Sequence, residues 1–527
     1  MATLNPDHRE LTDEAKERLA AADRHWKKVC PWLDDVLAFT QPRNVRPESK
    51  RALTDEASLD LFTSIGIEVN GDFASDLLSA FTPEQGDWVE LKPGIEIPEA
   101  ERRTVKEAAK ALAGTVFQEI SRSEFYATAP SAYKDFGAST GSIFIQDIGA
   151  ALPANVHHIP LSQLRLQVGP YGGVDDRFWV RKVFWKDIPA IFPGVQDALP
   201  PELKKKLKDN RMGTVEIVHG GWRIWDDVTQ ERWQWVQMID GWMWQPQELN
   251  GAGSMPMIVG RWDPNTLSPW GTGPGFNALA DLRSLDDVNY NIIDNVGKTV
   301  SPPMGYPDDG ILNPRDGVEA GDWLPMRPES GKDIVPLISG ARLDLGYFTK
   351  EDFELTIRRH YFQDQPIQRG KTPPTLGQWL DEAQRIQKRL GVPAAPMFAE
   401  FAAEVFLRFH RIKINRGQAR DIKLKDGTVV QLVPVNPVQR AQKQEDVLLA
   451  VRLMEIITQF FGPEVARVVV NMPETVRKIK DALGDDLVEL ENLDQAQAMT
   501  KLQTVLGMAG QAPPEMLNGG GEGARAA

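Results

Sequence analysis

The sequence has a single cysteine, Cys30, among its 527 residues. One thiol can form neither a disulfide within the chain nor a cysteine-based zinc site, and its amphipathic surroundings predict a plain buried residue. None of the seven histidines pairs with another at the i, i+4 spacing of a helical metal site, and the adjacent His157 and His158 are expected at a strand edge. We therefore expect no metal and no cofactor.

Long apolar runs are also missing. No stretch approaches the ~18 consecutive apolar residues that suggest a membrane span, and the N-terminus lacks the basic and then apolar pattern of a signal peptide. We expect a protein of a cytoplasm, without a membrane partner. The net charge of −14 argues against a protein that holds nucleic acid tightly, but it allows one past which DNA slides.

Catalytic motifs are absent too. The segments 297–299 and 370–372 end like phosphate-binding loops, but Ile292 and Gln365 stand where the first glycine of that motif belongs. The segment 271–275 resembles a dinucleotide loop only superficially, because Pro274 lacks an N–H group for a phosphate. The chain is not expected to be an enzyme, and a DNA-translocating ATPase is the alternative that the broken loops weigh against.

Helical periodicity dominates the N-terminal part. Apolar residues recur at spacings of three and four in residues 9–40, as one helix or as two in line interrupted at Pro31. Further helices are predicted at 60–83, 100–122 and 125–136. From about residue 156 the period changes to two, which predicts strands separated by turns at 158–161, 164–168, 178–185, 215–219, 232–238 and 256–260, in addition to 88–91 and 142–146.

Tryptophan is frequent, with 15 residues against 7 tyrosines, and eight of them lie between residues 222 and 270. They alternate with polar residues, so we expect them on one face of a sheet. Packing in the core and between subunits is the favoured interpretation. A glycan-binding or glycan-cleaving protein, with Trp233 and Trp235 in an aromatic platform, is the alternative.

The stretch 268–304 is the most informative. A loop rich in Gly and Pro precedes an apolar stripe that runs from Phe276 to Val300, and Pro302 and Pro303 end it. The other faces are acidic, and an unbroken helix of this length would span about 37 Å at ~1.5 Å per residue. A non-helical insert follows at 301–345. Thr349 is then expected to cap a second helix.

The C-terminal third again predicts helices. A loop at 363–375 precedes a long helix at 376–414, with a kink at Pro393 or at Pro396. A strand hairpin at 421–433 turns at Asp426-Gly427. Helices are predicted over 437–508.

In this order the elements resemble the portal, or head-to-tail connector, proteins of short-tailed bacteriophages, from about residue 10 to residue 435. The resemblance is carried by the segments 64–66, 73–83 and 88, 136–141, 159–161, 259–262, and by the long helix that ends at Pro302-Pro303. The chain departs from the family at Trp270-Gly271-Thr272, where an aromatic-Gly-Arg opening is usual. It departs again at 373–378, where Thr-Ala-Thr-Glu is usual.

The resemblance implies an α+β, multidomain portal-type ring subunit with a helical stem, a β-rich wing, a small α/β clip and a helical crown. The implied parts are a wing at 1–270, a stem helix at 271–300, a clip at 301–345, a second stem helix at 346–362, a tunnel loop at 363–375, a long kinked helix at 376–417, a wing hairpin at 418–436, a crown at 437–512 and a flexible tail at 513–527.

The resemblance also implies a function. Subunits, typically twelve, would form a ring at one capsid vertex of the virion, assembled in the host cytoplasm, through which double-stranded DNA enters and leaves without sequence-specific binding. Partners would be the terminase, a tail adaptor, the capsid, and scaffold or internal core proteins. The channel would be lined by Asp281, Asp286, Asp287, Asp294 and Lys298, the tunnel loop would touch DNA through Arg369 and Lys371, and the clip would contact its partners through Arg315, Trp323 and Arg327.

Overall fold

The computed structural model describes residues 7–50, 61–92, 99–149, 152–227, 230–307, 322–326, 335–336, 343–363, 393, 395–419, 431–434, 437–461, 470, 475–476 and 479. The chain divides into two units, Met1–Val435 and Asn436–Ala527. The described part of the second unit is mainly helix α13 (Pro437–Phe461), which ends where Gly462-Pro463 predicts a break. Most of the other helices predicted up to residue 508 lie outside the described residues.

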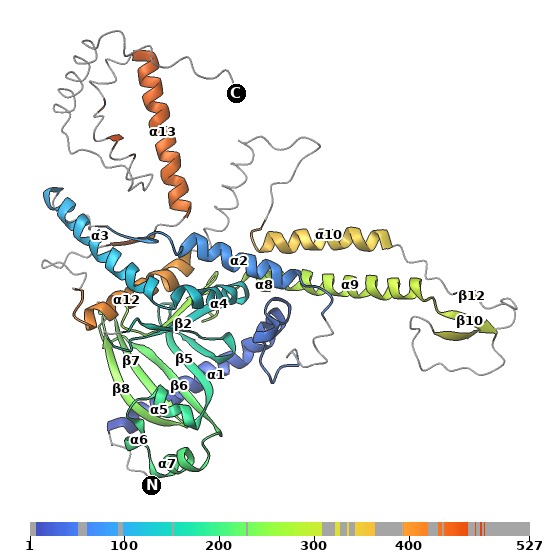
Figure 1. The fold of residues 1–527 in the computed structure, drawn as a ribbon, viewed down its shortest axis with the longest axis horizontal. Helices are drawn as coiled ribbons and strands as arrows, with labels where there is room; N and C mark the ends of the chain where they lie inside the picture. Colours follow the sequence, from blue (N-terminus) through green and yellow to red (C-terminus); the bar gives the residue numbers. More distant parts are fainter. Residues whose placement is uncertain are drawn as a thin grey trace, which may run out of the picture. The chain divides into compact units, whose positions relative to one another are not determined.

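Four helices open the first unit: α1 (Asp7–Thr40), α2 (Ile65–Phe81), α3 (Glu99–Arg122) and α4 (Phe125–Ala138). All four were predicted. The choice left open at Pro31 is settled, because α1 continues through that residue as one helix. Helix α2 packs on α4, and α4 in turn packs on strand β2 (Thr140–Gln146) (Figure 1).

Two antiparallel sheets form the centre of this unit. Strands β3 (Asn155–His158) and β9 (Met257–Arg261) flank β2, in the order β3-β2-β9. The second sheet runs in sequence order through β4 (Leu164–Val168), β5 (Val174–Phe184), β6 (Thr214–Ile224), β7 (Arg232–Ile239) and β8 (Trp242–Asn250). Strand β3 is an edge, as expected for His157 and His158. The Nε2 atom of His158 lies 2.7 Å from Oδ2 of Asp135 on α4.

The prediction that the tryptophans share one sheet face is wrong. Trp222 pairs with Gln234 on β7, whereas Trp235 pairs with Gly221, so the two indole rings point to opposite sides. Trp222 packs against Ala15 and Ala22 of α1, on the face that α1 covers. Trp233 and Trp235 lie in the main core, where Trp235 stacks on Phe144 of β2. Trp262 and Trp270 are buried outside this sheet.

Several elements escaped prediction. Strand β8 was not predicted, because Pro246 lies inside it and proline is tolerated in strands chiefly at sheet edges. Three short helices follow β5, namely α5 (Ile188–Ile191), α6 (Val195–Ala198) and α7 (Pro201–Asp209), and they pack into a separate small core around Trp185 and Phe192. Each has a proline or glycine at its start, a signal for short helices.

The remaining strands are short. Strand β1 (Val89–Lys92) pairs with β13 (Gln431–Pro434), so the end of the predicted hairpin joins the N-terminal region. The turn at Asp426-Gly427 lies outside the described residues. Within 301–345, β10 (Met304–Pro307) lies between β11 (Trp323–Met326) and β12 (Val335–Pro336). The mixed α+β class is confirmed.

Candidate functional site: the helix pair α9–α10 and its junction

Helix α9 (Leu279–Val300) and helix α10 (Leu343–His360) run side by side in opposite directions, with strands β10 to β12 between them in the sequence (Figure 1). The predicted unbroken helix from residue 276 is slightly shorter, because a single helical turn, α8 (Pro274–Asn277), precedes α9 and the chain is interrupted at Ala278. Thr349 is not a cap, contrary to prediction, since α10 already begins at Leu343.

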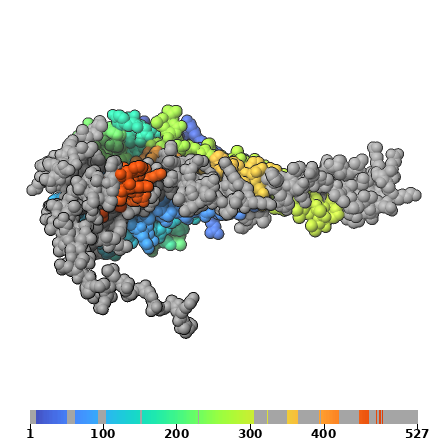
Figure 2. Space-filling model, turned by 90° about the horizontal axis from the view of Figure 1, so that it is seen from above, coloured from blue at the N-terminus to red at the C-terminus, as the bar shows by residue number. Residues whose placement is uncertain are grey.

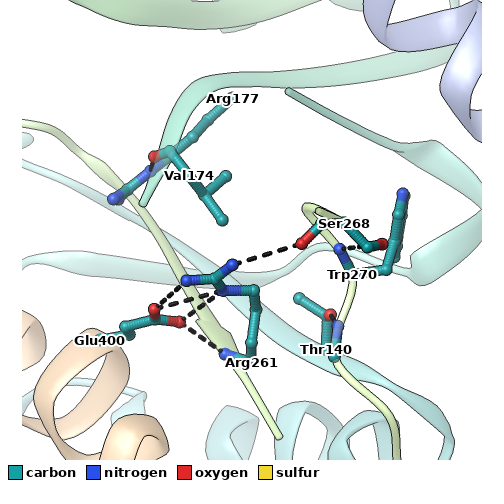
Figure 3. A network of polar contacts seen from close by, with 8 residues as sticks. Thr140, Val174, Arg177, Arg261, Ser268, Trp270 and Glu400 are labelled. Atoms are coloured by element: carbon teal, nitrogen blue, oxygen red, sulfur yellow. Dashed lines mark hydrogen bonds and ion pairs between the residues drawn. The ribbon is translucent and has the colours of Figure 1, made fainter. Parts of the chain in front are cut away.

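A buried arginine fixes the loop that leads into α8. The side chain of Arg261, at the end of β9, is buried, and its Nε atom lies 3.0 Å from Oε2 of Glu400 (Figure 3). Glu400 belongs to a π-helical turn, Phe398–Ala402, that precedes α12 (Ala403–Asn415). The Nη1 atom of Arg261 also donates to the carbonyl of Ser268 at 3.4 Å. One guanidinium therefore joins β9, the turn before α12 and the loop before α8.

The glycines of this loop serve close packing. The N–H of Gly271 donates to Oγ1 of Thr140 at 3.0 Å, and its carbonyl accepts from Oγ of Ser139 at 2.8 Å. A Cβ atom on Gly273 would lie only 2.4 Å from the carbonyl oxygen of Gly137. Backbone thus fills the space that a phosphate would need, which explains why the resemblance of 271–275 to a dinucleotide loop is superficial.

The first half of α9 is bound firmly to the body of the subunit. Leu282 and Leu285 are fully buried, and the segment before α2 lies along the same part of the helix. There the N–H of Phe62 donates to Oδ1 of Asp286 at 2.7 Å, and Nδ2 of Asn289 donates to the carbonyl of Phe62 at 3.1 Å. Asn289 was missed in the sequence, although a polar residue at the edge of an apolar stripe is a recognisable signal.

The second half of α9 carries an apolar stripe that the described part of the chain leaves uncovered. Ile293 is 55% exposed and Val300 is 81% exposed, with Tyr290 and Val296 exposed beside them. At 100° per residue, Ile293 and Val300 continue the face that buries Leu282 in the first half. Of the predicted stripe, Leu282 and Leu285 are buried, whereas Val296 and Val300 are exposed. Ile293 was not predicted as part of the stripe, but it lies on the same face.

Helix α10 returns to the body at its C-terminal end. Ile357 and Tyr361 are buried, and Phe353 packs on the same core, which confirms the predicted shared face of these three residues. The ring of Tyr361 lies 5.7 Å from that of Phe73 on α2, and burial raises the pKa of its hydroxyl. Leu355, on the opposite side of α10, is 53% exposed. The described part of α10 forms the gold surface in Figure 2.

The predicted channel residues of α9 fall into two groups. Asp281 lies 3.3 Å from Nε2 of His360, and Asp286 accepts from Phe62, so both are engaged within the subunit. Asp287, Asp294 and Lys298 are spaced by seven and four residues and share another face. On that face Asp294 and Lys298 form an ion pair of 2.8 Å. Asp287 is exposed and makes no ion pair with the residues that the structure describes.

Of the other five predicted site residues, the structure describes Trp323 alone. Arg315, Arg327, Arg369 and Lys371 lie outside the described residues. Trp323 begins β11, opposite Met304 of β10. In the described ranges no group of acidic, histidine or cysteine side chains is arranged to hold a metal ion, and no helix is long and apolar enough to cross a membrane.

The Trp-rich region does not present an aromatic platform. Trp233 is 3% exposed and Trp235 is 5% exposed, so neither ring has a free face for a sugar. The ring of Trp235 stacks on Phe144 at 6.0 Å, and the guanidinium of Arg177 lies 4.8 Å from the ring centre of Trp233. These contacts favour the packing interpretation of the tryptophans.

The helix pair α9–α10 leaves a mixed α+β body through a junction that Arg261 and close backbone packing hold together. The model of one family, the bacteriophage head to tail connecting proteins, matches residues 12–487. The chain therefore belongs to this family of structural proteins, which join the head and the tail of the virion. No curated protein compared with the chain matches it.

Proposed function

We propose that the chain is a portal subunit that assembles into a ring, with α9 and α10 as its stem. The observation that carries this proposal is the apolar stripe on the second half of α9, which remains exposed around Ile293 and Val300. An exposed stripe in line with a buried one favours burial against another molecule. In a ring of identical subunits, typically twelve, that molecule is the neighbouring copy.

A closed ring requires one surface of each subunit to fit a different surface of the next. The stripe of α9 would supply one of these surfaces, and the exposed side of α10 around Leu355 is a natural counterpart. Each contact between neighbours should bury more than ~1,000 Å², as stable interfaces do. Because the two helices leave the body together, the contact would repeat around a central channel.

The polar face of α9 would then line the channel. Asp287, Asp294 and Lys298 share this face, and the pairing of the last two leaves only weak net negative charge. A surface without a basic patch cannot hold DNA phosphates firmly, which suits a wall past which DNA moves. Asp281 and Asp286 are less suited to this role, because His360 and Phe62 engage them.

The remaining parts of the proposal follow the family. The ring would sit at one capsid vertex after assembly in the host cytoplasm, and genomic DNA would enter during packaging and leave during ejection. Arg369 and Lys371 of the tunnel loop would make transient DNA contacts. Arg315, Trp323 and Arg327 of the clip would meet the terminase first and a tail adaptor later, while the capsid and scaffold or internal core proteins would contact the outside.

Native mass spectrometry and electron microscopy of the purified protein test the proposal. We expect a ring with a central hole whose mass is a whole multiple of the subunit mass of 58.8 kDa. A protein that remains a monomer at micromolar concentration, and also when it is supplied with its capsid and scaffold proteins, would contradict it.

A further inference from the structure

An open pocket of about 370 Å³ lies at the edge of the five-stranded sheet. Its walls are the end of β2, strands β7 and β8, the turn between β8 and β9, and helix α12. Four consecutive residues of β8, 247–250, line it. In the described part of the chain β8 pairs only with β7, and it forms the outer strand of the sheet in Figure 1. The pocket therefore opens along a free strand edge.

The lining holds more hydrogen-bonding capacity than the chain uses. Five of the lining residues carry side-chain amides, each with two donor hydrogens and one acceptor oxygen. None of them hydrogen bonds to another residue in the ranges that the structure describes: Gln146, Gln237, Gln247, Asn250 and Asn415. Ser254 also lines the pocket, is only 4% exposed, and has an Oγ atom without a partner among the described residues. A buried hydroxyl without a partner costs free energy, so this arrangement favours a polar ligand.

The walls are held in place without a ligand. Arg408 of α12 is buried, and its guanidinium donates to the carbonyls of Ile145 at 3.2 Å and of Ser254 at 2.8 Å. The turn between β8 and β9 lies so close to α12 that a Cβ atom on Gly253 would be 2.3 Å from the backbone of Leu407. A site whose walls are fixed in advance loses little entropy when it binds.

We propose that this pocket and the adjoining edge of β8 bind an extended peptide segment of a partner protein. Side-chain amides present the same donor and acceptor groups as a peptide backbone, and a free edge can pair with an added strand. Pro246 has no N–H to donate, so the part of β8 that can pair with an added strand begins at Gln247. The charged groups of the lining already have partners within the chain, so no unpaired charge is offered to a ligand and the matching segment is uncharged and polar. Asp147 pairs with Arg416 and Glu248 pairs with Arg232. Arg408 and Arg411 donate to the carbonyls of Ser254 and Ala252.

A sugar fits the same surroundings less well. Saccharides usually stack on an exposed aromatic face, but the Trp235 ring at the floor is 5% exposed and is covered by Phe144. The peptide proposal is independent of the ring and of DNA. Its failure would leave the portal proposal untouched, since the pocket residues lie on the body and not on α9 or α10.

The test begins with selection of binders from a displayed library of random 12-residue peptides, followed by synthesis of the best peptide. Binding to the full chain is measured by fluorescence anisotropy, and backbone protection is measured by hydrogen exchange. We expect slower exchange within 247–250 on binding, at the N–H groups that point away from β7. The double variant Gln247→Ala with Asn250→Ala should bind about 10-fold more weakly. The variant Gln196→Ala, an exposed glutamine of α6 outside the pocket, should bind like the unaltered protein.

Native mass spectrometry of the same samples shows whether the double variant assembles normally, so a loss of peptide binding is separated from a loss of assembly or folding. Four outcomes overturn the proposal. These are the absence of any peptide that protects 247–250, equal binding by the double variant, protection of 247–250 by assembly of the chain alone, and saturable binding of N-acetylglucosamine or maltose that the double variant loses.

Discussion

The two halves of helix α9 differ although their sequences follow the same pattern. In the first half Leu282 and Leu285 are fully buried, and Asn289 is tied to the backbone of Phe62. In the second half Ile293 and Val300 stand on the continuation of the same face and are 55% and 81% exposed. An apolar stripe in a sequence therefore does not say how much of its length the same chain buries.

The difference separates two tasks. The first half anchors the helix to the body, where its burial contributes to the stability of the subunit. The second half contributes little to the folded subunit and is available to a neighbour. Substitutions along one helix should accordingly divide into those that unfold the subunit and those that prevent assembly, and the following predictions test that division.

The largest effect is expected in the first half. Leu282→Ala removes a fully buried side chain and should lower the free energy of unfolding by about 2–5 kcal/mol. Ile293→Ala is the matched control on the same helix face, and in dispersed subunits it should change stability by no more than ~0.5 kcal/mol. Chemical denaturation of both variants, followed by tryptophan fluorescence, makes the comparison. Equal losses in the two variants would abolish the distinction between the halves.

Mild acid should lower the free energy of unfolding through His219 in the body of the subunit, and not through the second half of α9. Burial among aromatic rings lowers the pKa of His219 to about 3, whereas its unfolded value is about 6.5. The folded protein holds His219 in its neutral form. The contribution of this residue to stability is therefore fully present above pH 6.5, where the histidine is neutral in the unfolded chain as well. It is lost as the pH falls towards 3, by up to about 1.4 kcal/mol per pH unit.

Denaturation between pH 7 and pH 5 measures this slope. The variant His219→Phe keeps an aromatic ring beside Phe192 but cannot titrate. Its unfolding should take up one proton fewer, so its free energy of unfolding should fall less steeply between pH 7 and pH 5. Identical slopes for the variant and the unaltered protein would show that His219 does not titrate as its burial requires. The described part of α9 holds no histidine, so no matching change is expected from its second half.

A smaller effect is expected where the first half ends. Asn289→Ala removes the hydrogen bond from Nδ2 to the carbonyl of Phe62 and should cost about 1 kcal/mol. Exchange of the Phe62 N–H should also become faster, because Phe62 loses one of its two hydrogen bonds to α9. Asn291→Ala, an exposed asparagine on the same helix, is the control, and an equal loss from it would remove the special role of Asn289.

The smallest effect is expected from the ion pair in the second half. Lys298→Ala breaks a partly exposed pair with Asp294 at i, i+4 spacing and should change subunit stability by less than ~0.5 kcal/mol. Thermal unfolding at low and at high salt measures it. A loss of 2 kcal/mol or more would mean that the second half of α9, like the first, stabilises the isolated subunit.

Much of the fold could be predicted from the sequence, because periodicity and proline positions reflect local physics. The four N-terminal helices, most strands, the stop at Pro302 and the apolar face of α10 all followed from such patterns. Long-range packing was beyond reach. Nothing local indicates that Trp222 and Trp235 point to opposite faces, or that Glu400 pairs with Arg261 across 139 positions of sequence.

In the candidate site, too, local features could be predicted from the sequence and long-range contacts could not. All five predicted channel residues of α9 were listed together, although helical geometry places Asp287, Asp294 and Lys298 on one face. Spacing could not show that Asp281 and Asp286 are engaged by His360 and by the backbone of Phe62, because those partners come from distant segments. The surplus of aspartate on α9 is thus smaller in effect than composition indicates.

The central claim is that the second half of α9 is a contact between subunits. The double variant Ile293→Asp with Val300→Asp places charge on the exposed stripe and leaves the buried first half intact. Native mass spectrometry of this variant, beside the control variant Asp287→Asn, tests the claim most directly. We predict folded monomers for the double variant and rings for the control, whereas intact rings from the double variant would contradict the account.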